Sequence, residues 1–567
     1  MKEYKKYAWS GLLCIGVEVV LEITVPLLMA DLIDYGVTNA DGTYIIKKGL
    51  QMALCAVLAL ILGVGSAKFS ALAGQGLGAN IRKAEYEKLQ SYSFSNIDHF
   101  SVSSLVTRLT SDVTNIQNAV STGMRPFGRS PVMLIFATSF AFRINSTLAL
   151  VFLVALPTLA VLLILIIINV GPLYGRMQSA IDQVNRCIQE NLTAIRVVKS
   201  YVRGDYEVEK FGVVNENLKS ESEKAFGTAV LNMPAMQFVM YGTILGILLI
   251  GGRLINEGQM MIGQLTSFLS YVLLILNSLM MMSNVFLLMT RSLASAERIM
   301  EVIDEKIDIT DENAKDIAVA KGEIEFDHVW FKYKDTAKEY VLSDVSFHIK
   351  PGQTVGIIGQ TGSSKTTLVQ LIPRLYDVTK GEVKIDGINV KEYPVRHLRD
   401  SVAMVLQKNT LFSGSLIDNL RWGNEKATLD EIKEACQIAC VDEFVDRLAD
   451  GYDTEMGQEG VNVSGGQKQR ICIARAILKK PKVLILDDST SAVDTATEAK
   501  IRSGLAEKLP DMTKIIIAQR ISSVRHADQI IIMDRGHVEA IGTHESLLRD
   551  NQIYQEIYAS QKEGADL

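Results

Sequence analysis

Residues 359–366 read GQTGSSKT, a run that combines glycines and small hydroxyl side chains with Lys365 and Thr366. In such a loop, backbone amides and a helix N-terminus cradle phosphates, the lysine neutralises the outer phosphates, and the threonine hydroxyl ligates magnesium. The pattern GxxxxGK[ST] places glycine directly before the lysine, where this chain has Ser364. A side chain there can crowd the approach of phosphate, so Ser364 puts the nucleotide affinity in question. The residues predicted to contact the nucleotide are Gly359, Gln360, Thr361, Gly362, Ser363, Ser364, Lys365, Thr366 and Thr367.

Residues 484–494 read LILDDSTSAVD, an apolar segment that ends in Asp487 and Asp488. A buried strand that ends in a carboxylate can deliver it to the magnesium ion of a bound nucleotide. Asp487 is therefore predicted to be a metal ligand, together with Thr366.

Short strands and helices must position these residues. Residues 355–358 predict a buried strand before the glycine loop, and the chain from Thr366 onward is predicted to be helical. Further strands are predicted at 483–486 and 514–518, and residues 322–331 alternate like an edge strand. Strands that alternate with helices predict an α/β nucleotide-binding domain, which we place at residues 322–567 after an acidic, aperiodic linker at 304–321.

Residues 1–303 have a different composition, with long apolar runs that predict a transmembrane domain. The whole chain is 48% hydrophobic, which is unusual for a soluble protein. The third predicted span is the weakest, because Arg125 and Arg129 lie just before it. The six predicted spans lie near residues 8–33, 50–69, 131–142 with an upstream extension, 148–170, 230–251 and 265–289.

The distribution of cations predicts the orientation of the spans. The presumed outer loops hold only Lys47, Lys48, Arg143 and Arg253, and the presumed inner segments hold many more cations, as the positive-inside tendency requires. The basic start runs into an apolar segment without a cleavage pattern, which predicts a retained first span. We expect a multi-pass protein of a bacterial plasma membrane with both termini in the cytosol. The polar inner segments 78–116 and 173–224 are predicted to be helical extensions that reverse in short elements able to touch another domain.

Composition excludes two other kinds of site. The net charge of −6 gives no electrostatic reason to expect nucleic acid, whose binding proteins usually have a basic face. The six cysteines are scattered, and although Cys436 and Cys440 lie four apart, no histidine or further cysteine completes a metal set. Buried cysteines in a reducing compartment are the expected arrangement.

Glu18 and Glu22 lie four residues apart, and therefore on one face of the first predicted span. An ionisable group at membrane depth suggests a functional site, here one that contacts substrate. The alternative is that both carboxylates pair with polar groups on neighbouring helices or lie near a water-filled vestibule for structural reasons, and the sequence leaves both interpretations open.

Residues 461–470 read VNVSGGQKQR and lie between the glycine loop and LILDD. The three motifs together resemble the ATP-binding cassette, and SGGQ is the most specific part of the resemblance. Six spans followed by one cassette resemble a half-transporter of the ATP-binding cassette exporter family, over essentially the whole chain. The resemblance implies that the chain binds ATP and Mg²⁺.

The resemblance also implies roles for residues outside the glycine loop. Tyr333 matches the aromatic residue that stacks on adenine, and Gln407 matches the glutamine that reaches magnesium and the attacking water. Without the resemblance, Tyr333 would be interpreted as surface packing and Gln407 as a solvated loop residue. Asp494 matches a loop that lies across the interface of two cassettes. The signature residues that would contact the γ-phosphate bound by the opposite cassette are Ser464, Gly465, Gly466 and Gln467.

Two positions depart from the family pattern. The hydrolytic site of the family has a glutamate directly after the magnesium aspartate and a histidine on a later strand, where this chain has Asp488 and Gln519. Aspartate is shorter by about 1.5 Å of reach, and a misplacement of about 1 Å can cost on the order of 100-fold in rate. Gln519 can donate a hydrogen bond but cannot carry charge. We expect slow hydrolysis with Asp488, Gln519 and Gln407 as the catalytic residues, the alternative being a backbone shift that lets Asp488 reach the water.

An intact SGGQ beside this altered pair predicts a heterodimer, in which the signature of this chain completes the working site of a non-identical half-transporter. The expected function is ATP-driven outward transport of small amphipathic or drug-like compounds, with the lipid bilayer as a further partner. The alternatives are a lipid or peptide exporter, and a nucleotide-gated regulatory or channel subunit that does not pump.

Overall fold

The computed structural model describes residues 3–563 except 313, 335 and 489–492. Ser489, Thr490, Ser491 and Ala492 of LILDDSTSAVD therefore lie outside the described residues, as does Asn313 of the predicted linker. The chain forms two compact units, one of Met1–Leu89 with Ser103–Asp304 and one of Gln90–Val102 with Glu305–Leu567.

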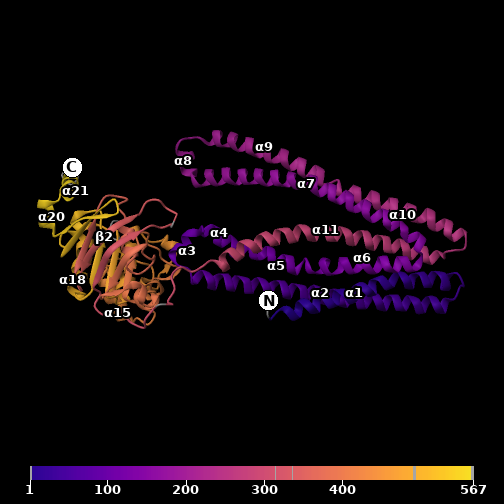
Figure 1. The fold of residues 1–567 in the computed structure, drawn as a ribbon, viewed down its shortest axis with the longest axis horizontal. Coiled ribbons are helices and arrows are strands. Elements are labelled where there is room, and N and C mark those ends of the chain that lie inside the picture. Colours follow the sequence, from indigo (N-terminus) through magenta and orange to yellow (C-terminus); the bar gives the residue numbers. More distant parts are fainter. Residues whose placement is uncertain (1–2, 313, 335, 489–492, 564–567) are drawn as a thin grey trace. The chain divides into compact units, whose positions relative to one another are not determined.

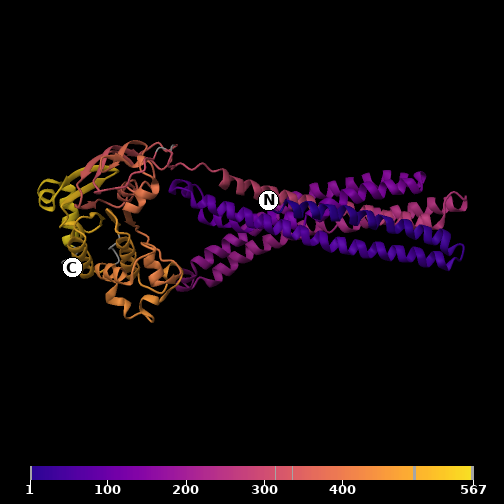
Figure 2. The ribbon, with the colours of Figure 1, turned by 90° about the horizontal axis from the view of Figure 1, so that it is seen from below.

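The first unit is entirely helical in its described residues (Figures 1 and 2). Helices α1, α6 and α11 pack on one another, and α7 packs along α9 and α10. Their buried apolar side chains form one core drawn from α1, α6, α7, α10 and α11. The elements are α1 (Lys5–Asp31), η1 (Leu32–Val37), α2 (Gly42–Gln90), α4 (Val102–Thr107), η2 (Arg108–Asp112), α5 (Val113–Ser121), α6 (Met124–Ile144), α7 (Ser146–Thr193), α8 (Ile195–Ser200), α9 (Gly204–Ala229), α10 (Asn232–Asn256) and α11 (Ile262–Asp304).

Five helical segments of the described chain, rather than the predicted six, are long and apolar enough to cross a membrane. They are Lys5–Val37, Gly42–Gln90, Ser146–Thr193, Gly204–Asn256 and Ile262–Met282. The third predicted span corresponds to α6, a helix of 21 residues that includes Arg125, Arg129 and Arg143. These arginines lower its mean hydropathy, so the count of six is not confirmed.

The polar inner segments are helical, as predicted. At about 1.5 Å per residue, the 49 residues of α2 and the 48 residues of α7 are each far longer than a hydrocarbon core of about 30 Å. The second inner segment reverses in the short helix α8. The first reverses in α3 (Phe94–His99), which packs with the second unit although the chain joins both its ends to helices of the first.

Side-chain hydrogen bonds hold α3 within the second unit. Tyr376 donates to Asp98 Oδ2 at 2.6 Å, and Asn96 Nδ2 donates to the carbonyl oxygen of Lys306 at 2.8 Å. Burial, followed by the bond to Asp98, raises the pKa of the Tyr376 hydroxyl. These contacts lie inside the second unit, to which α3 belongs.

The second unit contains a six-stranded sheet of order β12-β11-β3-β10-β9-β6, parallel except for β12, and a four-stranded antiparallel sheet of order β2-β1-β4-β5. The central strands are buried on both faces and read as continuous apolar runs, which is typical of a covered parallel sheet. The large-sheet strands are β3 (Thr354–Ile358), β6 (Val402–Val405), β9 (Val483–Asp487), β10 (Thr513–Ile517), β11 (Gln529–Asp534) and β12 (His537–Gly542). The others are β1 (Ile324–Phe331), β2 (Leu342–Ile349), β4 (Lys380–Ile385), β5 (Ile388–Asn389), and the pair β7 (Gly414–Ser415) and β8 (Glu455–Met456).

The predicted combination of a helical transmembrane domain with an α/β domain is confirmed. The helices of the second unit include α12, which starts at Lys365 in the glycine loop. Besides α3, they are α12 (Lys365–Gln370), η3 (Val390–Glu392), α13 (Val395–Ser401), α14 (Leu416–Arg421), α15 (Leu429–Ile438), α16 (Asp442–Val445), η4 (Gly451–Asp453), η5 (Gln458–Gly460), α17 (Gly465–Leu478), α18 (Thr495–Lys508), α19 (Ile521–Val524), α20 (His544–Asp550) and α21 (Gln552–Glu563).

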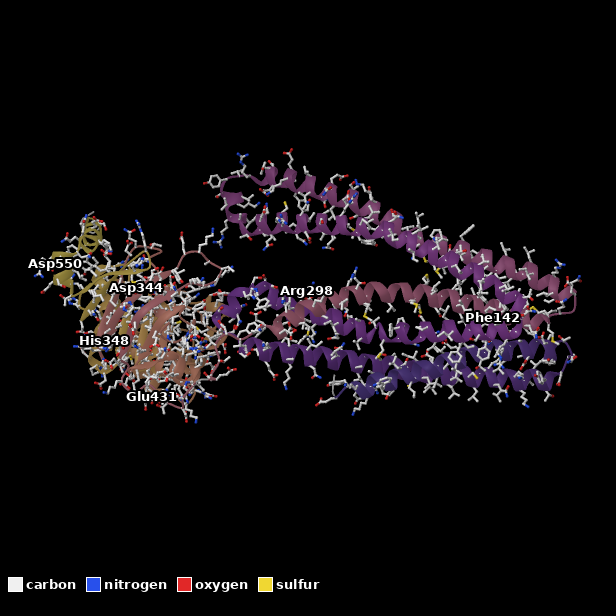
Figure 3. All side chains as sticks on the ribbon, in the orientation of Figure 1. Phe142, Arg298, Asp344, His348, Glu431 and Asp550 are labelled. Carbon is white, nitrogen blue, oxygen red and sulfur yellow. The ribbon has the colours of Figure 1, made fainter. Side chains whose placement is uncertain are left out.

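A buried carboxylate joins η2 to α11 in the helical unit. Asp112 accepts hydrogen bonds from Ser295 Oγ and from Arg298 Nε, both at 2.8 Å (Arg298 is labelled in Figure 3). The hydrogen bond from Arg298 lowers the pKa of Asp112. The pair therefore stabilises the fold above the ordinary pKa of aspartate, and this contribution is lost as the pH falls.

We predict that Arg298→Gln lowers the free energy of unfolding by about 2 kcal/mol near neutral pH, less than for a fully enclosed pair because Arg298 is half exposed. Unfolding in detergent, followed by circular dichroism, measures the change. Lys219→Gln is the control, because it breaks an ion pair of similar length with Glu216 on an exposed surface. Equal effects of the two substitutions would show that burial of Asp112 does not strengthen its pairing.

Candidate nucleotide site

The carboxyl ends of the parallel strands bring the predicted site residues together. The glycine loop follows β3, Gln407 follows β6, Asp487 ends β9, and Gln519 follows β10. In-register pairing places Ile517 opposite Asp487, so the segments leave the sheet at one edge. A hollow of about 300 Å³ lies there, lined by Thr361, Gly362, Ser363, Ser364, Lys365, Thr366, Thr367, Gln407, Asp487, Asp488, Ile517 and Gln519.

Lys365 is held over the loop that precedes it. Its Nζ donates to the carbonyl oxygens of Gly359 and Gln360, both at 2.9 Å, and burial lowers its pKa. Glycine is required at 359, because a Cβ there would lie 2.2 Å from the carbonyl oxygen of Met533. The sequence motif gives no sign of the Met533 contact, which arises because β11 lies beside β3.

Ser364 has a left-handed backbone, with φ of 71°, directly before α12. Glycine adopts this conformation without a Cβ penalty, whereas another residue is destabilised by roughly 1 to 2 kcal/mol. Serine in place of glycine at this position of the loop pattern therefore strains the backbone.

The oxygen atoms at this edge fit a magnesium site. The Thr366 hydroxyl donates to Asp487 Oδ1 at 3.0 Å, and burial raises the pKa of Asp487, which is 1% exposed. Gln407 lines the same hollow. A hydroxyl, a carboxylate and an amide carbonyl are hard donors of the kind that Mg²⁺ prefers alongside phosphate oxygens and water.

Asp488 is bonded to Gln519 rather than held apart from it. Gln519 Nε2 donates to Asp488 Oδ2 at 2.8 Å, and Asp488 has a left-handed φ of 49°. Its backbone nitrogen donates to the carbonyl oxygen of Ile517 at 3.1 Å, which continues the strand pairing past the end of β9. Burial raises the pKa of Asp488, and the bond from Gln519 partly opposes this shift. The two residues that depart from the family pattern are thus direct partners.

Tyr333 lies beside the loop helix. Its hydroxyl is 2.8 Å from Thr367 Oγ1, and its ring contacts Phe331 and Tyr376 edge-on while remaining 44% exposed. The ring is therefore partly accessible beside the glycine loop, and the adenine contact of Tyr333 stays a prediction.

The SGGQ residues lie outside the hollow. Ser464 caps α17 through two hydrogen bonds. Its Oγ accepts a hydrogen bond from the backbone nitrogen of Gln467, and the Gln467 side chain accepts one from the backbone nitrogen of Ser464. Gly465 and Gly466 form the first turn of this helix. Asp494 caps α18 through the backbone nitrogen of Thr497 at 2.9 Å. Ser464 is exposed, so its helix terminus is accessible to a ligand bound elsewhere.

Glu18 and Glu22 are ion-paired in the helical unit. Glu18 Oε1 accepts from Arg125 at 2.6 Å and from Arg129 at 3.1 Å, while Arg129 also donates to Glu22 Oε2 at 2.5 Å. From the sequence, Arg125 and Arg129 are predicted only to weaken the third span, and no pairing with the two glutamates is predicted. The usable signal is that both pairs have a spacing of four, which puts each pair on one helix face.

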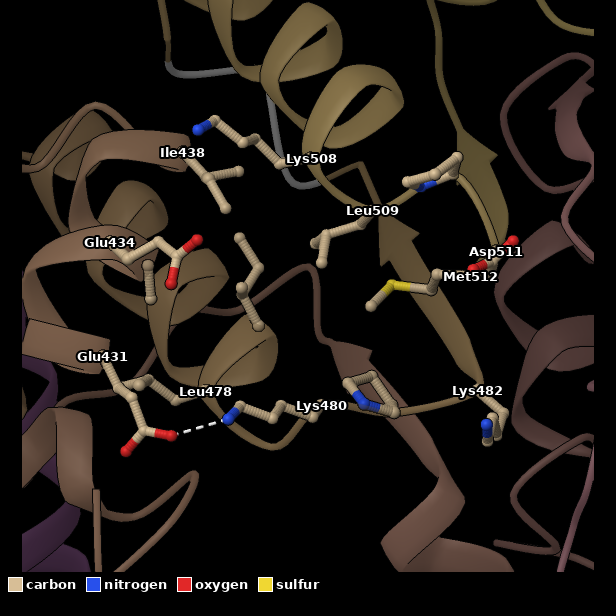
Figure 4. A pocket seen from close by; sticks show the side chains of 14 residues that line it. Glu431, Glu434, Ile438, Leu478, Lys480, Lys482, Lys508, Leu509, Asp511 and Met512 are labelled. Atoms are coloured by element: carbon tan, nitrogen blue, oxygen red, sulfur yellow. Dashed lines mark hydrogen bonds and ion pairs between the residues drawn. The ribbon is translucent and has the colours of Figure 1, made fainter. Parts of the chain in front are cut away.

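A second hollow of the α/β unit, of about 380 Å³, lies where α15, α17 and α18 end near β10 (Figure 4). Glu431 and Lys480 form an ion pair of 2.6 Å at its rim, and Leu509 and Met512 line its floor. It shares no residue with the hollow at the glycine loop.

We predict that Ser364→Gly raises the free energy of unfolding by about 1 kcal/mol, because glycine relieves the left-handed strain. It should also tighten the binding of a fluorescent ATP analogue several-fold, measured by titration. Ser503→Gly is the control, because Ser503 lies inside α18, where glycine destabilises a helix by about 0.5 to 1 kcal/mol. Lower stability of Ser364→Gly would contradict the strain argument, and weaker nucleotide binding would contradict the argument that the Ser364 side chain crowds the phosphate.

The raised pKa of Asp488 predicts a pH dependence of stability. A carboxyl whose folded pKa is raised contributes stability below its ordinary pKa and loses it as the pH rises through the folded value. The unfolding temperature of the nucleotide-free chain relative to Asp488→Asn should therefore fall as the pH rises from about 4. Asp494→Asn should give the opposite sign, because the backbone bond from Thr497 lowers the pKa of Asp494. Parallel profiles for the two variants would refute this assignment.

Comparison with known families agrees with the two units. Residues 9–279 match the family described as "ABC transporter transmembrane region", and residues 342–491 match the one described as "ABC transporter".

Named relatives extend over nearly the whole chain. It is 38% identical over 568 residues to "Uncharacterized ABC transporter ATP-binding protein YfiB" of Bacillus subtilis, covering 100% of this chain and 98% of the relative. It is 31% identical to "Putative multidrug export ATP-binding/permease protein YgaD" of the same organism (99% and 98%). It is 32% identical to the "ATP-dependent lipid A-core flippase" of Pseudomonas putida (98% and 94%).

A solved structure, that of a bacterial Atm1-family ABC exporter with ATP bound, has the same fold with a TM-score of 0.83, covering 98% of each chain at 23% identity. One transmembrane region followed by one ATP-binding cassette makes this chain a half-transporter, and the protein belongs to the ABC transporter family, among its exporters.

Proposed function

We propose that this chain is one subunit of a heterodimeric, ATP-driven exporter of amphipathic or drug-like compounds, and that its own ATP site hydrolyses slowly. The observation that carries the proposal is the 2.8 Å bond between Gln519 and Asp488. The side chain of Asp488 is one methylene shorter than the family's glutamate, and a neutral amide holds its carboxylate. Gln519 takes the place of the family's histidine, which would contact the γ-phosphate. The hydrolytic counterpart of this site would then stand on another chain.

The residues of this site bind nucleotide better than they activate water. Lys365 would exchange its two loop carbonyls for phosphate oxygens, and the loop amides would hold the remaining charge. Thr366, Asp487 and Gln407 would hold Mg²⁺, which neutralises phosphate charge when bound. Among the described residues that line the hollow, Asp488 is the carboxylate beside this set, and its Oδ2 accepts a hydrogen bond from Gln519.

The signature supports the second half of the proposal. Ser464 and the first amides of α17 form a capped, exposed helix N-terminus of the kind that binds anions. This terminus would complete the ATP site of a non-identical partner, with Asp494 near the shared interface. The membrane unit would use α6 as the sixth span, with both termini in the cytosol of a bacterial cell.

The multidrug name of one relative supports drug-like cargo, and the flippase name of another supports lipid as the second candidate. ATP-dependent uptake into inverted vesicles against a gradient distinguishes either exporter from a nucleotide-gated channel subunit. A channel would only let the concentrations of the compound inside and outside the vesicles become equal.

We predict that the purified full-length chain alone hydrolyses ATP slowly, and that Asp488→Glu together with Gln519→His raises its rate at least tenfold, since about 1 Å of reach can change a rate by up to about 100-fold. Phosphate release in detergent measures both. Lys365→Ala in the restored background is the control, and it should abolish the gain. A fast wild-type ATPase without a partner would overturn the heterodimer proposal.

A further inference from the structure

The four charged side chains of the helical unit line a cavity of about 780 Å³ bounded by α1, α2, α6 and α11. They alternate in sign along a chain of contacts that runs from Arg125 to Glu18, then to Arg129, then to Glu22. In the described lining of the cavity these four are the charged residues, so its formal charge is zero.

Glu18 is the buried member of this chain of contacts, and Arg129, whose side chain is 22% exposed, is held between the two carboxylates. The Glu18 side chain is 4% exposed and accepts from both arginines, while Gly63 on α2 leaves room for the pair, because a Cβ there would lie 3.1 Å from Arg125 and from Glu18 Oε1. At the ends, the Arg125 side chain is 40% exposed and that of Glu22 is 27% exposed. The cavity therefore offers one cation and one anion at separate points.

The remaining wall is apolar except for Ser270. Leu60 and Val64 of α2 face the cavity together with Leu273 and Leu274 of α11. An apolar wall with a few placed charges suits a ligand that has a tail and a polar head. A head of single charge would meet repulsion from one end of the chain of contacts, and displacing the buried pair would leave a charge unpaired at membrane depth.

We infer that this cavity binds a zwitterionic amphiphile, whose anionic group contacts Arg125 and whose cationic group contacts Glu22, with the tail on the wall of α2 and α11. The inference rests on the proposed function, because it names the class of compound carried. It narrows the expectation that Glu18 and Glu22 contact substrate: Glu18 organises the arginines, and Glu22 receives the cation.

Binding to the full-length chain in nanodiscs of phosphatidylglycerol tests the inference without ATP. The probe is radiolabelled dodecylphosphocholine, corrected for empty nanodiscs. The competitors share its tail and differ in charge: dodecyltrimethylammonium, dodecyl phosphate and uncharged dodecyl maltoside, with free phosphocholine as the tailless arm. Unlabelled dodecylphosphocholine should displace the probe at about tenfold lower concentration than any of these, because it makes one more charge-assisted hydrogen bond or ion pair with the cavity.

Substitutions at the two accessible ends test the polarity of the site and leave Glu18 and Arg129 in place. Arg125→Gln should weaken the binding of the zwitterion about tenfold and leave the binding of the cationic probe unchanged. Glu22→Gln should weaken the binding of the zwitterion and leave the binding of the anionic probe unchanged. Arg143→Gln, at the far end of α6, is the matched control and should change nothing. The competitor series on the wild-type chain decides the question even if a variant fails to fold.

Equal displacement by all probes, preference for a singly charged probe, or variants that bind like the wild type would each overturn the inference. Free phosphocholine as effective as the amphiphile would also overturn it. Failure here with intact ATP-dependent uptake leaves the exporter proposal standing. Selective zwitterion binding without any uptake overturns the exporter proposal alone.

Discussion

The nucleotide site depends on the in-register pairing of parallel strands in the large sheet. Because β3, β6, β9 and β10 run in the same direction, the segments that follow them leave the sheet at one edge. Side chains far apart in the sequence, such as Lys365 and Gln519, thereby line one hollow. A slip of one residue would turn Asp487, the predicted metal ligand, to the other face of the sheet. The buried apolar strands therefore do more than stabilise the unit, since they fix the positions of its chemistry.

Two residues of this edge have backbone conformations that L side chains rarely adopt. Ser364 and Asp488 both have left-handed φ values, one before α12 and the other after β9. Such strain persists where the surrounding structure holds it, here through the packed sheet and the bond from Gln519 to Asp488. Asp488 and Gln519 therefore form an ordered pair, and the proposal of slow hydrolysis starts from this arrangement.

Two buried carboxylates in the helical unit are paired with arginines. Asp112 and Glu18 are buried, and each is paired with arginine from another helix. Isolated charges there would be strongly unfavourable, so pairing is the condition under which acidic residues can be kept inside such a bundle. The two pairs have different structural roles. Asp112 joins two helices, whereas Glu18 belongs to a chain of contacts that lines a cavity.

The sequence by itself determined the division into an apolar helical region and an α/β region, the strands that lead to Lys365 and Asp487, and the family. The division and the strands follow from local information, namely the periodicity of apolar residues, whereas the family was predicted from the resemblance of three motifs to the ATP-binding cassette. The count of spans was less secure, because α6 includes arginines whose hydropathy argues against a span while their pairing partners lie on α1. Only the tertiary structure decided that Gln519 bonds Asp488, that Met533 requires glycine at 359, and that Arg125 and Arg129 neutralise Glu18 and Glu22. Each of these contacts joins residues distant in the chain, and it is the packing of strands and helices, which no local pattern specifies, that brings them together.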